Sequence, residues 1–319
     1  MVQAPDRDGK LAYEEWGDPQ GYPVFLLHGT PGSRLGPRPR TFHLHNLGIR
    51  LIAYDRPGYG DSDPHTGRSV ADAALDVRAI ADTLGIGRYS VVGRSGGGPH
   101  ALSCAALTPE RVRSAAAVVT VAPPDAEGLN WLVGMAESNV MTYTMMARNS
   151  PDLTQVGALL ARNADAIRRD PSSLLSSLAG EMPAVDRRVV EDAGIRDLLQ
   201  LNYLSAVGEA DEPSEPDGGG PAPLPEPLGW IDDLVALRQP WGFAPEEISD
   251  VPVLLWHGEQ DVFAPVSHFH WLADRIPGAS AVLQPSAAHF AALPALGPIL
   301  AWVRDNAAVP SGRVRDHAG

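Results

Sequence analysis

The sequence has a single cysteine, no long apolar run and no excess of basic charge, and each of these features excludes a class of protein. Cys104 is the only cysteine, so neither an intramolecular disulfide nor a cysteine metal cluster can form. No uninterrupted apolar run approaches the ~20 residues that a membrane-spanning helix needs. The polar segment 1–10 lacks the apolar stretch of a signal peptide. We therefore expect a cytoplasmic protein without a membrane partner.

The charge balance also restricts the partners. Asp and Glu number 39 against 25 for Lys and Arg, which gives a formal net charge of -14. Nucleic acids and anionic membranes attract basic patches, so neither is an expected partner of this acidic chain. The expected partner is a small-molecule substrate, and the sequence does not decide between a monomer and a homodimer.

Short apolar runs alternate with helical patterns in both the first and the last part of the 319-residue chain. This alternation is typical of βαβ units, so it predicts an α/β fold with a mostly parallel sheet. Residues 10–16 and the stretch before them are expected to form an antiparallel hairpin at one edge. The other expected strands are 24–27, 50–54, 89–92, 115–121, 251–256 and 280–283. The expected helices of this part are 69–84, 98–107, 265–276 and 290–306.

A long helical stretch interrupts the alternation of strands and helices. We interpret residues 125–248 as an inserted helical cap, and residues 1–124 together with 249–319 as the core. Segment 211–227 is acidic and rich in Pro and Gly, a composition that predicts a mobile loop. The helices expected in the cap are 129–148, 153–167, 172–179 and 184–207.

The strongest chemical motif is the sequence Gly93-Arg94-Ser95-Gly96-Gly97, which fits G-x-S-x-G between an expected strand and an expected helix. A sharp turn from strand to helix forces the serine into a strained conformation, and side chains two positions away on either side would collide. Gly93 and Gly97 remove that collision. The motif in this context indicates that Ser95 is a nucleophile.

Three segments together resemble the α/β-hydrolases over nearly the whole chain, the cap excepted. They are His28-Gly29-Thr30-Pro31-Gly32, the run from Asp55 to Ser62, and the serine motif itself. The resemblance implies an α/β-hydrolase fold, a mostly parallel twisted sheet flanked by helices with an inserted helical cap. It also implies that the backbone N–H groups of Thr30 and Gly96 form an oxyanion hole.

The family order of serine, acid and then histidine implies that His289 is the base, because it follows the last expected strand. The family usually has glycine before this histidine, whereas Ala288 stands here. His257 competes for the role, although at a strand end it is equally suited to a cap. His268 and His270 are interpreted as a pair on a helix surface.

The carboxylate that orients the histidine is expected in the loop after strand 251–256. Gly258-Glu259-Gln260-Asp261 resembles the acid loop of the family there, so Asp261 is favoured. Asp125 after the strand 115–121 is the alternative position.

Other residues are candidates for the substrate pocket. Arg94 is suited either to contact with a substrate carboxylate or to packing, and Asp233 is a candidate partner of a substrate amine. Trp131 belongs to a helical stripe that is suited both to packing within the cap and to lining the pocket. His43 and His45 lie on opposite faces, so no metal site is expected, and no cofactor is needed. The full set of pocket candidates is His28, Gly29, Arg94, Trp131, Met135, Met145, Trp230 and Asp233.

The expected activity is hydrolysis of an ester or lactone of a small, fairly apolar substrate through an acyl-enzyme on Ser95. One alternative is a proline-iminopeptidase-like aminopeptidase, although Thr30 replaces the glycine that is usual in that group. Cofactor-free tailoring of natural products without hydrolysis is a second alternative, because the fold alone does not determine the chemistry. The alternative that is not an enzyme is a ligand-binding pseudo-hydrolase.

Overall fold

A seven-stranded sheet organises the computed structural model, which describes residues 1–5, 7–146, 153–208 and 226–307. The strand order is β3-β5-β4-β6-β7-β8-β9, and every neighbouring pair is parallel except β3 with β5. The strands are β3 (Tyr13–Gly17), β4 (Tyr22–Leu27), β5 (Ile49–Tyr54), β6 (Tyr89–Arg94), β7 (Val112–Val118), β8 (Val253–Gly258) and β9 (Ser280–Gln284). The predicted mostly parallel sheet is therefore confirmed.

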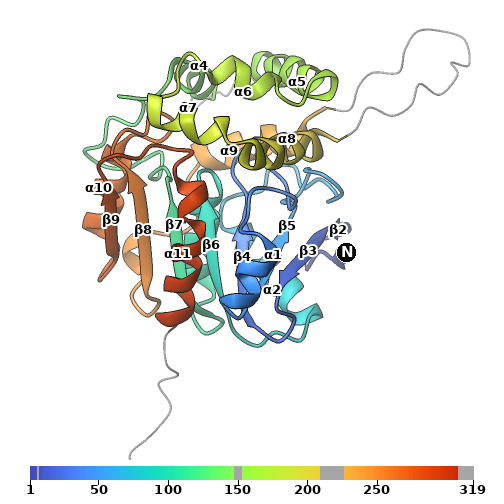
Figure 1. The fold of residues 1–319 in the computed structure, drawn as a ribbon, viewed down its shortest axis with the longest axis vertical. Coiled ribbons are helices and arrows are strands. Elements are labelled where there is room, and N and C mark those ends of the chain that lie inside the picture. Colours follow the sequence, from blue (N-terminus) through green and yellow to red (C-terminus); the bar gives the residue numbers. More distant parts are fainter. Residues whose placement is uncertain (6, 147–152, 209–225, 308–319) are drawn as a thin grey trace, which may run out of the picture.

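The central strands are apolar because helices cover both faces of the sheet. Every residue of β6 and of β8 is buried, as expected for parallel strands that are covered on both sides. Helices α3 and α11 both contact β6 and β7, and they lie on opposite faces (Figure 1). The helices around the sheet are α1 (Thr41–Asn46), α2 (Asp72–Thr83), α3 (Gly97–Leu107), α10 (Val266–Arg275) and α11 (Ala292–Asp305).

The chain between β7 and β8, here called the inserted segment, is helical and lies over one end of the sheet (Figure 1). Its helices are α4 (Glu137–Met145), α5 (Leu153–Arg169), α6 (Ser173–Leu178), α7 (Ala184–Glu191), α8 (Ala193–Val207) and α9 (Leu228–Arg238), followed by the short 3₁₀ helix η1 (Pro245–Glu247). Helix α9 is an addition to the helices that the sequence predicted. Most of the segment 211–227, predicted to be a mobile loop, lies outside the described residues.

Two predicted helices and one predicted hairpin differ from the structure. The helix predicted for 129–148 begins only at Glu137, because Gly134 has a φ of +86° and turns the chain before it. The helix predicted for 184–207 is two helices, since the side chain of Asp192 accepts the N–H of Ile195 and starts a second one. The hairpin predicted around 10–16 is divided between two sheets. In the smaller sheet, β1 (Val2–Gln3) pairs with β2 (Lys10–Leu11), whereas β3 joins the main sheet.

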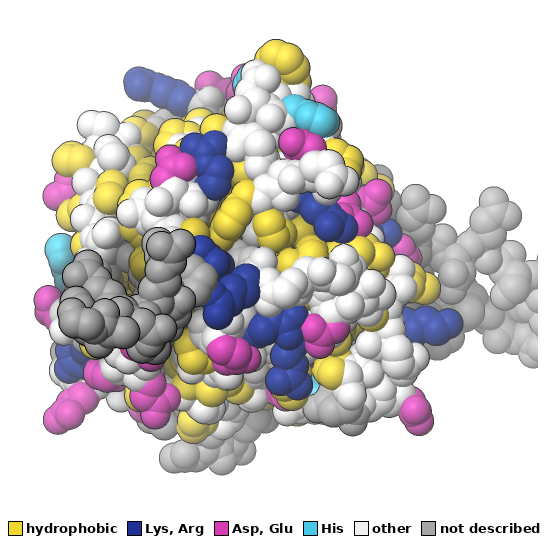
Figure 2. Space-filling model, turned by 90° about the horizontal axis from the view of Figure 1, so that it is seen from below, with side chains coloured by type: hydrophobic (Ala, Val, Ile, Leu, Met, Phe, Trp, Pro, Cys, Tyr) yellow, Lys and Arg dark blue, Asp and Glu magenta, His cyan; other side chains and the backbone are white. Residues whose placement is uncertain are grey.

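The end of the molecule away from the inserted segment carries charge of both signs. Figure 2 shows Lys and Arg side chains beside Asp and Glu side chains there, with apolar side chains between them. Opposite charges that alternate in this way largely cancel beyond the screening length of ~8 Å at physiological salt.

Candidate active site

Ser95 occupies a strained turn between β6 and α3. Its φ is +55°, one of two positive values among the non-glycine residues that the structure describes. A side chain at Gly93 would clash, because its Cβ would lie 2.0 Å from the carbonyl oxygen of Gly97. The N–H of Ser95 donates to Val118 O at 2.8 Å, and the hydroxyl of Thr120 donates to Ser95 O at 3.0 Å. These contacts hold the serine in a conformation that it would not adopt alone.

His289 and Asp261 are hydrogen-bonded to each other. His289 Nδ1 lies 2.8 Å from Asp261 Oδ2, and both side chains are buried. The other oxygen, Asp261 Oδ1, accepts the N–H groups of Phe263 and Ala264 at 2.8 and 2.9 Å. The carboxylate is thereby fixed in the turn after β8. Because Asp261 holds Nδ1, the remaining ring nitrogen of His289, Nε2, is the one available to a neighbour.

A second carboxylate holds the backbone around His289. Asp186, in the first turn of α7, accepts the N–H of His289 at 3.0 Å, of Phe290 at 2.7 Å and of Ala291 at 3.2 Å. These N–H groups precede α11, where a helix start leaves donors without partners in its own helix. Burial raises the pKa of the Asp186 carboxyl, and the nearby His289 acts in the opposite direction. The inserted segment therefore fixes the loop that carries His289.

Ser95 and His289 line the same cavity, which has a volume of about 160 Å³. The cavity lies between the sheet and the inserted segment, with Thr30, Arg94 and Gly96 also on the core side. Its other lining residues are Pro31, Val121, Ser138, Asn139, Thr142, Tyr143, Leu160, Asn163, Leu174, Ser177, Leu178, Tyr203, Trp230, Leu234, Phe263, Ala264 and Phe290. The mixture of apolar side chains and neutral polar side chains suits a small organic molecule.

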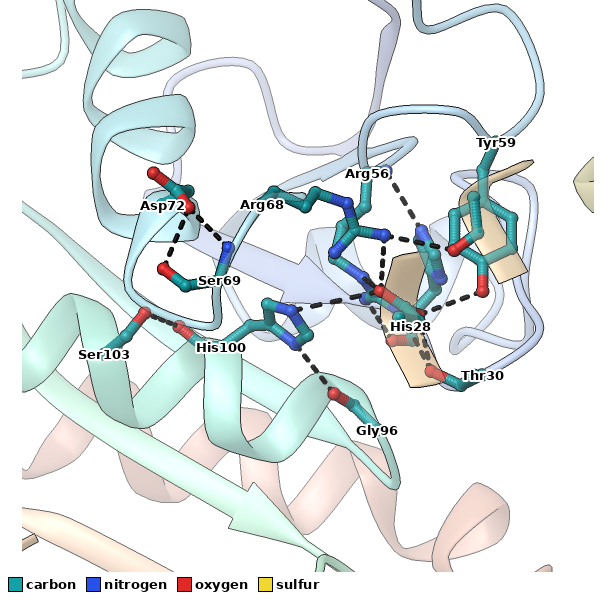
Figure 3. Close-up of polar contacts among 12 residues, drawn as sticks. His28, Thr30, Arg56, Tyr59, Arg68, Ser69, Asp72, Gly96, His100 and Ser103 are labelled. Atoms are coloured by element: carbon teal, nitrogen blue, oxygen red, sulfur yellow. Dashed lines mark hydrogen bonds and ion pairs between the residues drawn. The ribbon is translucent and has the colours of Figure 1, made fainter. Parts of the chain in front are cut away.

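The backbones of Thr30 and Gly96 face each other beside Ser95. A Cβ built on Gly96 would lie 2.2 Å from Thr30 Oγ1 and 3.4 Å from Thr30 N. Gly96 directly precedes α3, whose first N–H groups have no acceptor within the helix. His100 Nδ1, one turn further on, contacts Gly96 O at 2.8 Å and fixes that peptide (Figure 3). Two backbone segments that carry N–H groups thus meet at one edge of the cavity.

A buried network around Asp233 holds Thr30 from behind. Asp233, on α9, accepts hydrogen bonds from Thr30 Oγ1 at 2.5 Å, Tyr59 OH at 2.9 Å, Arg68 Nη2 at 2.6 Å, and Arg56 Nη2 at 2.5 Å. Arg56 Nε adds a further bond at 3.0 Å (Figure 3). Burial alone would raise the pKa of the Asp233 carboxyl, but Arg56 and Arg68 together hold it well below the ordinary value. The predicted contact of Asp233 with a substrate is therefore replaced by a contact with two arginines.

His28 and Gly29 also support the site from outside the cavity. Arg56 donates to His28 O at 2.5 Å and to Gly29 O at 2.9 Å. The backbone N–H of Arg56 donates to His28 Nε2 at 3.1 Å, and His28 Nδ1 lies 2.8 Å from Gly29 O. Burial and the adjacent Arg56 hold the pKa of His28 well below its usual range, so this ring is neutral. Both residues were predicted to line the pocket, and the structure instead uses them to shape the segment before Thr30.

Only some of the remaining pocket candidates line the cavity. Arg94 and Trp230 line the cavity, whereas Trp131, Met135 and Met145 do not. Trp131 Nε1 donates to Ala122 O at 2.8 Å, and its ring packs edge-on against Tyr143. Trp131, Met135 and Met145 therefore pack within the protein, which was one of the two roles predicted for the stripe to which they and Met146 belong.

Two of the competing histidines have structural partners. His257 Nε2 contacts Ala264 O at 2.7 Å. His268 was predicted on a helix surface, but it is fully buried. Its Nδ1 accepts the N–H of Ala122 at 3.0 Å, and its Nε2 donates to Trp131 O at 2.9 Å. Burial lowers the pKa of His268 to about 4, so the ring is neutral at physiological pH.

Sequence reasoning missed several residues that shape the site. Asp186 and Arg68 act across more than 100 positions of sequence, and no local pattern marks such contacts. Tyr143, Tyr203 and Phe263 also line the cavity. The sequence does not specify how the elements that carry them are placed relative to the sheet. The one available signal was the acid in the first turn after Pro183, which is typical of a helix start.

The alpha/beta hydrolase fold model matches residues 22–295 of the chain. The chain belongs to the alpha/beta hydrolase fold family. Over 109 residues it is 38% identical to a proline iminopeptidase of Xylella fastidiosa (strain 9a5c), a match that covers 33% of this chain and 34% of that protein. The match thus spans about a third of this curated relative.

Solved structures extend the likeness over the whole fold. A thermophilic esterase from Thermogutta terrifontis is 20% identical with a TM-score of 0.64, and the match covers 96% of this chain and 98% of that one. An enol-lactonase from Burkholderia xenovorans LB400 is 20% identical with a TM-score of 0.57, covering 93% and 95%. At these identities the likeness shows the fold.

The described residues offer neither a metal site nor a membrane-spanning helix. They hold no group of three or more His, Cys, Asp or Glu side chains placed to bind a metal ion. None of the helices that the structure describes is both long enough and apolar enough to cross a lipid bilayer.

Proposed function

We propose that this protein hydrolyses an ester or lactone through an acyl-enzyme on Ser95, with His289 as the base and Asp261 orienting it. The observation that carries the proposal is the hydrogen bond between His289 Nδ1 and Asp261 Oδ2, in a cavity that Ser95 also lines. A strained serine that lines the same cavity as a histidine held by a carboxylate is suited to activation of the serine hydroxyl.

The proposed reaction has two halves that use the same groups. Ser95 Oγ attacks the carbonyl carbon while His289 Nε2 takes the hydroxyl proton. The N–H groups of Thr30 and Gly96 stabilise the negative oxygen, and each such donor contributes about 2.7–4 kcal/mol in a well-studied protease. His289 then protonates the leaving oxygen, and the acyl-enzyme remains. Water attacks this ester with His289 again as base, which releases the acid and restores Ser95.

The lining favours a small substrate. A volume of about 160 Å³ is below the ~300–1,000 Å³ typical of pockets for drug-sized ligands. Val121, Leu160, Leu234 and Phe263 give the cavity apolar walls. The fold shared with an esterase and an enol-lactonase adds support for this class of reaction.

A proline-iminopeptidase-like activity is the second candidate, because the curated relative with 38% identity over 109 residues carries that name. An aminopeptidase must bind the ammonium group of its substrate, for which a carboxylate is the natural partner. Among the described lining residues there is no Asp or Glu. We therefore rank ester or lactone hydrolysis first.

Labelling with a fluorophosphonate probe tests the proposal. Wild type should label covalently, whereas Ser95→Ala and His289→Ala should not, and His270→Ala should label like wild type because His270 is exposed and outside the cavity. A panel of p-nitrophenyl esters, lactones and prolyl amides then identifies the reaction. Absence of labelling in folded wild type would reject the serine mechanism. Labelling with turnover of prolyl amides alone would establish the second candidate.

A further inference from the structure

Arg94 is a buried cation that has no hydrogen-bond or ion-pair partner among the residues that the structure describes. It is the last residue of β6 and is only 7% exposed. Within the described residues its guanidinium forms neither a hydrogen bond nor an ion pair, whereas the buried Arg56 and Arg68 share the carboxylate of Asp233. Uncompensated buried charge is costly, so an arginine of this kind calls for an explanation.

The nearest acids are already occupied. Asp261 and Asp186 are the carboxylates that act on Arg94 through space. Asp261 is bonded to His289 and to two backbone N–H groups. Asp186 is bonded to three backbone N–H groups. Burial lowers the pKa of Arg94, but a guanidinium remains charged at neutral pH.

The guanidinium of Arg94 and the side chain of Ser95 both lie close to Gly29. A Cβ built on Gly29 would be 3.2 Å from Arg94 Nη2 and 3.5 Å from Ser95 Cβ, so both atoms border the same small volume. Arg94 lines the main cavity and also a neighbouring one of about 20 Å³. A space of that size holds about one water molecule, so an organic partner must reach Arg94 through the main cavity.

Arg94 is also the sole permanently charged side chain among the described residues that line the main cavity. Tyr203, on α8 of the inserted segment, lines the same cavity as Arg94. The net charge of -14 opposes an anion at long range, but salt screens charges beyond ~8 Å. Inside the cavity the local cation therefore dominates.

We propose that Arg94 binds a carboxylate of the substrate, so that the preferred substrates are half-esters of short dicarboxylic acids or lactones that carry a carboxylate. The planar guanidinium matches a carboxylate with two parallel hydrogen bonds. Because Arg94 adjoins Ser95 in the chain, the carboxylate and the scissile carbonyl must be separated by a short carbon chain. This inference rests on the proposed hydrolase function.

The kinetic test compares two esters that differ only in charge. Mono-p-nitrophenyl glutarate and p-nitrophenyl pentanoate have acyl chains of equal length, and only the first carries a carboxylate. We expect kcat/KM of wild type to be at least tenfold higher for the glutarate. Arg94→Met should lower that ratio at least tenfold, Arg94→Lys should retain part of it, and Arg88→Met should leave it unchanged. Arg88 is exposed and precedes the opposite end of the same strand.

A binding test separates this inference from the hydrolase function. Calorimetry with Ser95→Ala and monomethyl glutarate measures the carboxylate site without turnover. Adding Arg94→Met to that variant should weaken binding at least tenfold. Since Arg94 loses no hydrogen bond or ion pair with the described part of the chain, the Tm of Arg94→Met should equal or exceed that of wild type, which shows that the variant folds.

The outcomes are distinct. Ser95-dependent hydrolysis without preference for the charged ester would overturn the carboxylate site and leave the hydrolase standing. Glutarate binding that depends on Arg94 in a protein without esterase activity would support the site and reject the reaction. A lower Tm for Arg94→Met with unchanged binding would assign Arg94 to structure and overturn the inference.

Discussion

Gly96 stands between Ser95 and the first turn of α3, where a methyl group has no room. A Cβ there would lie 2.2 Å from Thr30 Oγ1 and 2.9 Å from Thr30 Cβ. Thr30 is in turn held by Asp233 through its hydroxyl. At the scale of single residues, the site therefore depends on the distance between two short stretches of backbone.

Gly96→Ala should lower kcat/KM for ester substrates by about 10²–10³, because the methyl group moves Thr30 and removes one donor to the oxyanion. Steady-state kinetics on a p-nitrophenyl ester measures the change. Gly87→Ala is the control, since nothing lies within 4 Å of its Cβ position. Full activity in Gly96→Ala would exclude Thr30 from the oxyanion hole.

Asp261→Asn should lower kcat by about 10⁴, because an amide cannot stabilise the charged form of His289. Asp125→Asn should leave kcat within twofold of wild type, as Asp125 is exposed and the bond to His289 Nδ1 belongs to Asp261. The two variants, measured side by side, decide between the two acids that the sequence left open. The reverse result would assign the role to Asp125.

At the scale of elements, α9 carries two adjacent acids, and Asp233 is the one that binds it to the core. Asp233 bonds with Arg56, Arg68, Tyr59 and Thr30. The neighbouring Asp232 has one oxygen 3.5 Å from the N–H of Gly67 and one without a partner among the described residues. Burial raises the pKa of the Asp232 carboxyl, with Arg68 opposing that effect. The carboxylates of Asp232 and Asp233 are adjacent in the chain, yet the charge of Asp233 is well compensated and that of Asp232 is not.

Asp233→Asn should reduce the free energy of unfolding by about 3–5 kcal/mol, because two buried guanidinium groups lose their counter-charge. Asp232→Asn should change it by less than about 1 kcal/mol, or raise it, because the wild-type carboxylate is poorly compensated. Urea denaturation of both variants provides the comparison. Equal losses would show that the network around Asp233 does not hold α9.

How far the sequence predicts these elements depends on the range of the interactions. Strand β6 and helix α3 were predicted closely because apolar patterning and the glycines around Ser95 are local signals. The start of α4 was missed because the preceding turn is held by distant contacts, such as the bond from Ala136 N to Val262 O. His289, whose N–H donates to Asp186, lies 103 positions away from it. The role of Asp186 can therefore be recognised only in the folded chain.

At the scale of the whole molecule, buried neutral histidines couple stability to pH. Burial lowers the pKa of each, to about 3 for His100 and about 4 for His268. Histidine in an unfolded chain has a pKa near 6.5. Below that pH the unfolded chain therefore binds protons at histidines that stay neutral in the folded protein. The contribution of these histidines to the free energy of unfolding is therefore fully present above about pH 6.5. It is lost as the pH falls toward their pKa values in the folded protein. Among the described residues, the histidines of this kind are His28, His100, His257 and His268.

A buried histidine whose folded pKa is lowered to about 4 or below, such as His100 or His268, should contribute about 1.4 kcal/mol per pH unit to the loss between roughly pH 6 and 5. His268→Gln should reduce the slope of the unfolding free energy against pH by that amount. The exposed His270→Gln should leave the slope unchanged. Chemical denaturation at several pH values measures all three proteins, and the difference between slopes removes the opposing effect of carboxyls with raised pKa. Parallel slopes for wild type and His268→Gln would contradict the assignment.

The two acids that link the inserted segment to the core have a consequence for protein engineering. Asp186 on α7 holds the backbone at His289, and Asp233 on α9 holds Thr30. A chimera that exchanges this segment for that of a relative, in order to transplant specificity, also exchanges the supports of His289 and Thr30. Grafts that keep both aspartates in register should preserve catalysis while specificity changes. Grafts chosen by cavity-facing residues alone should lose both.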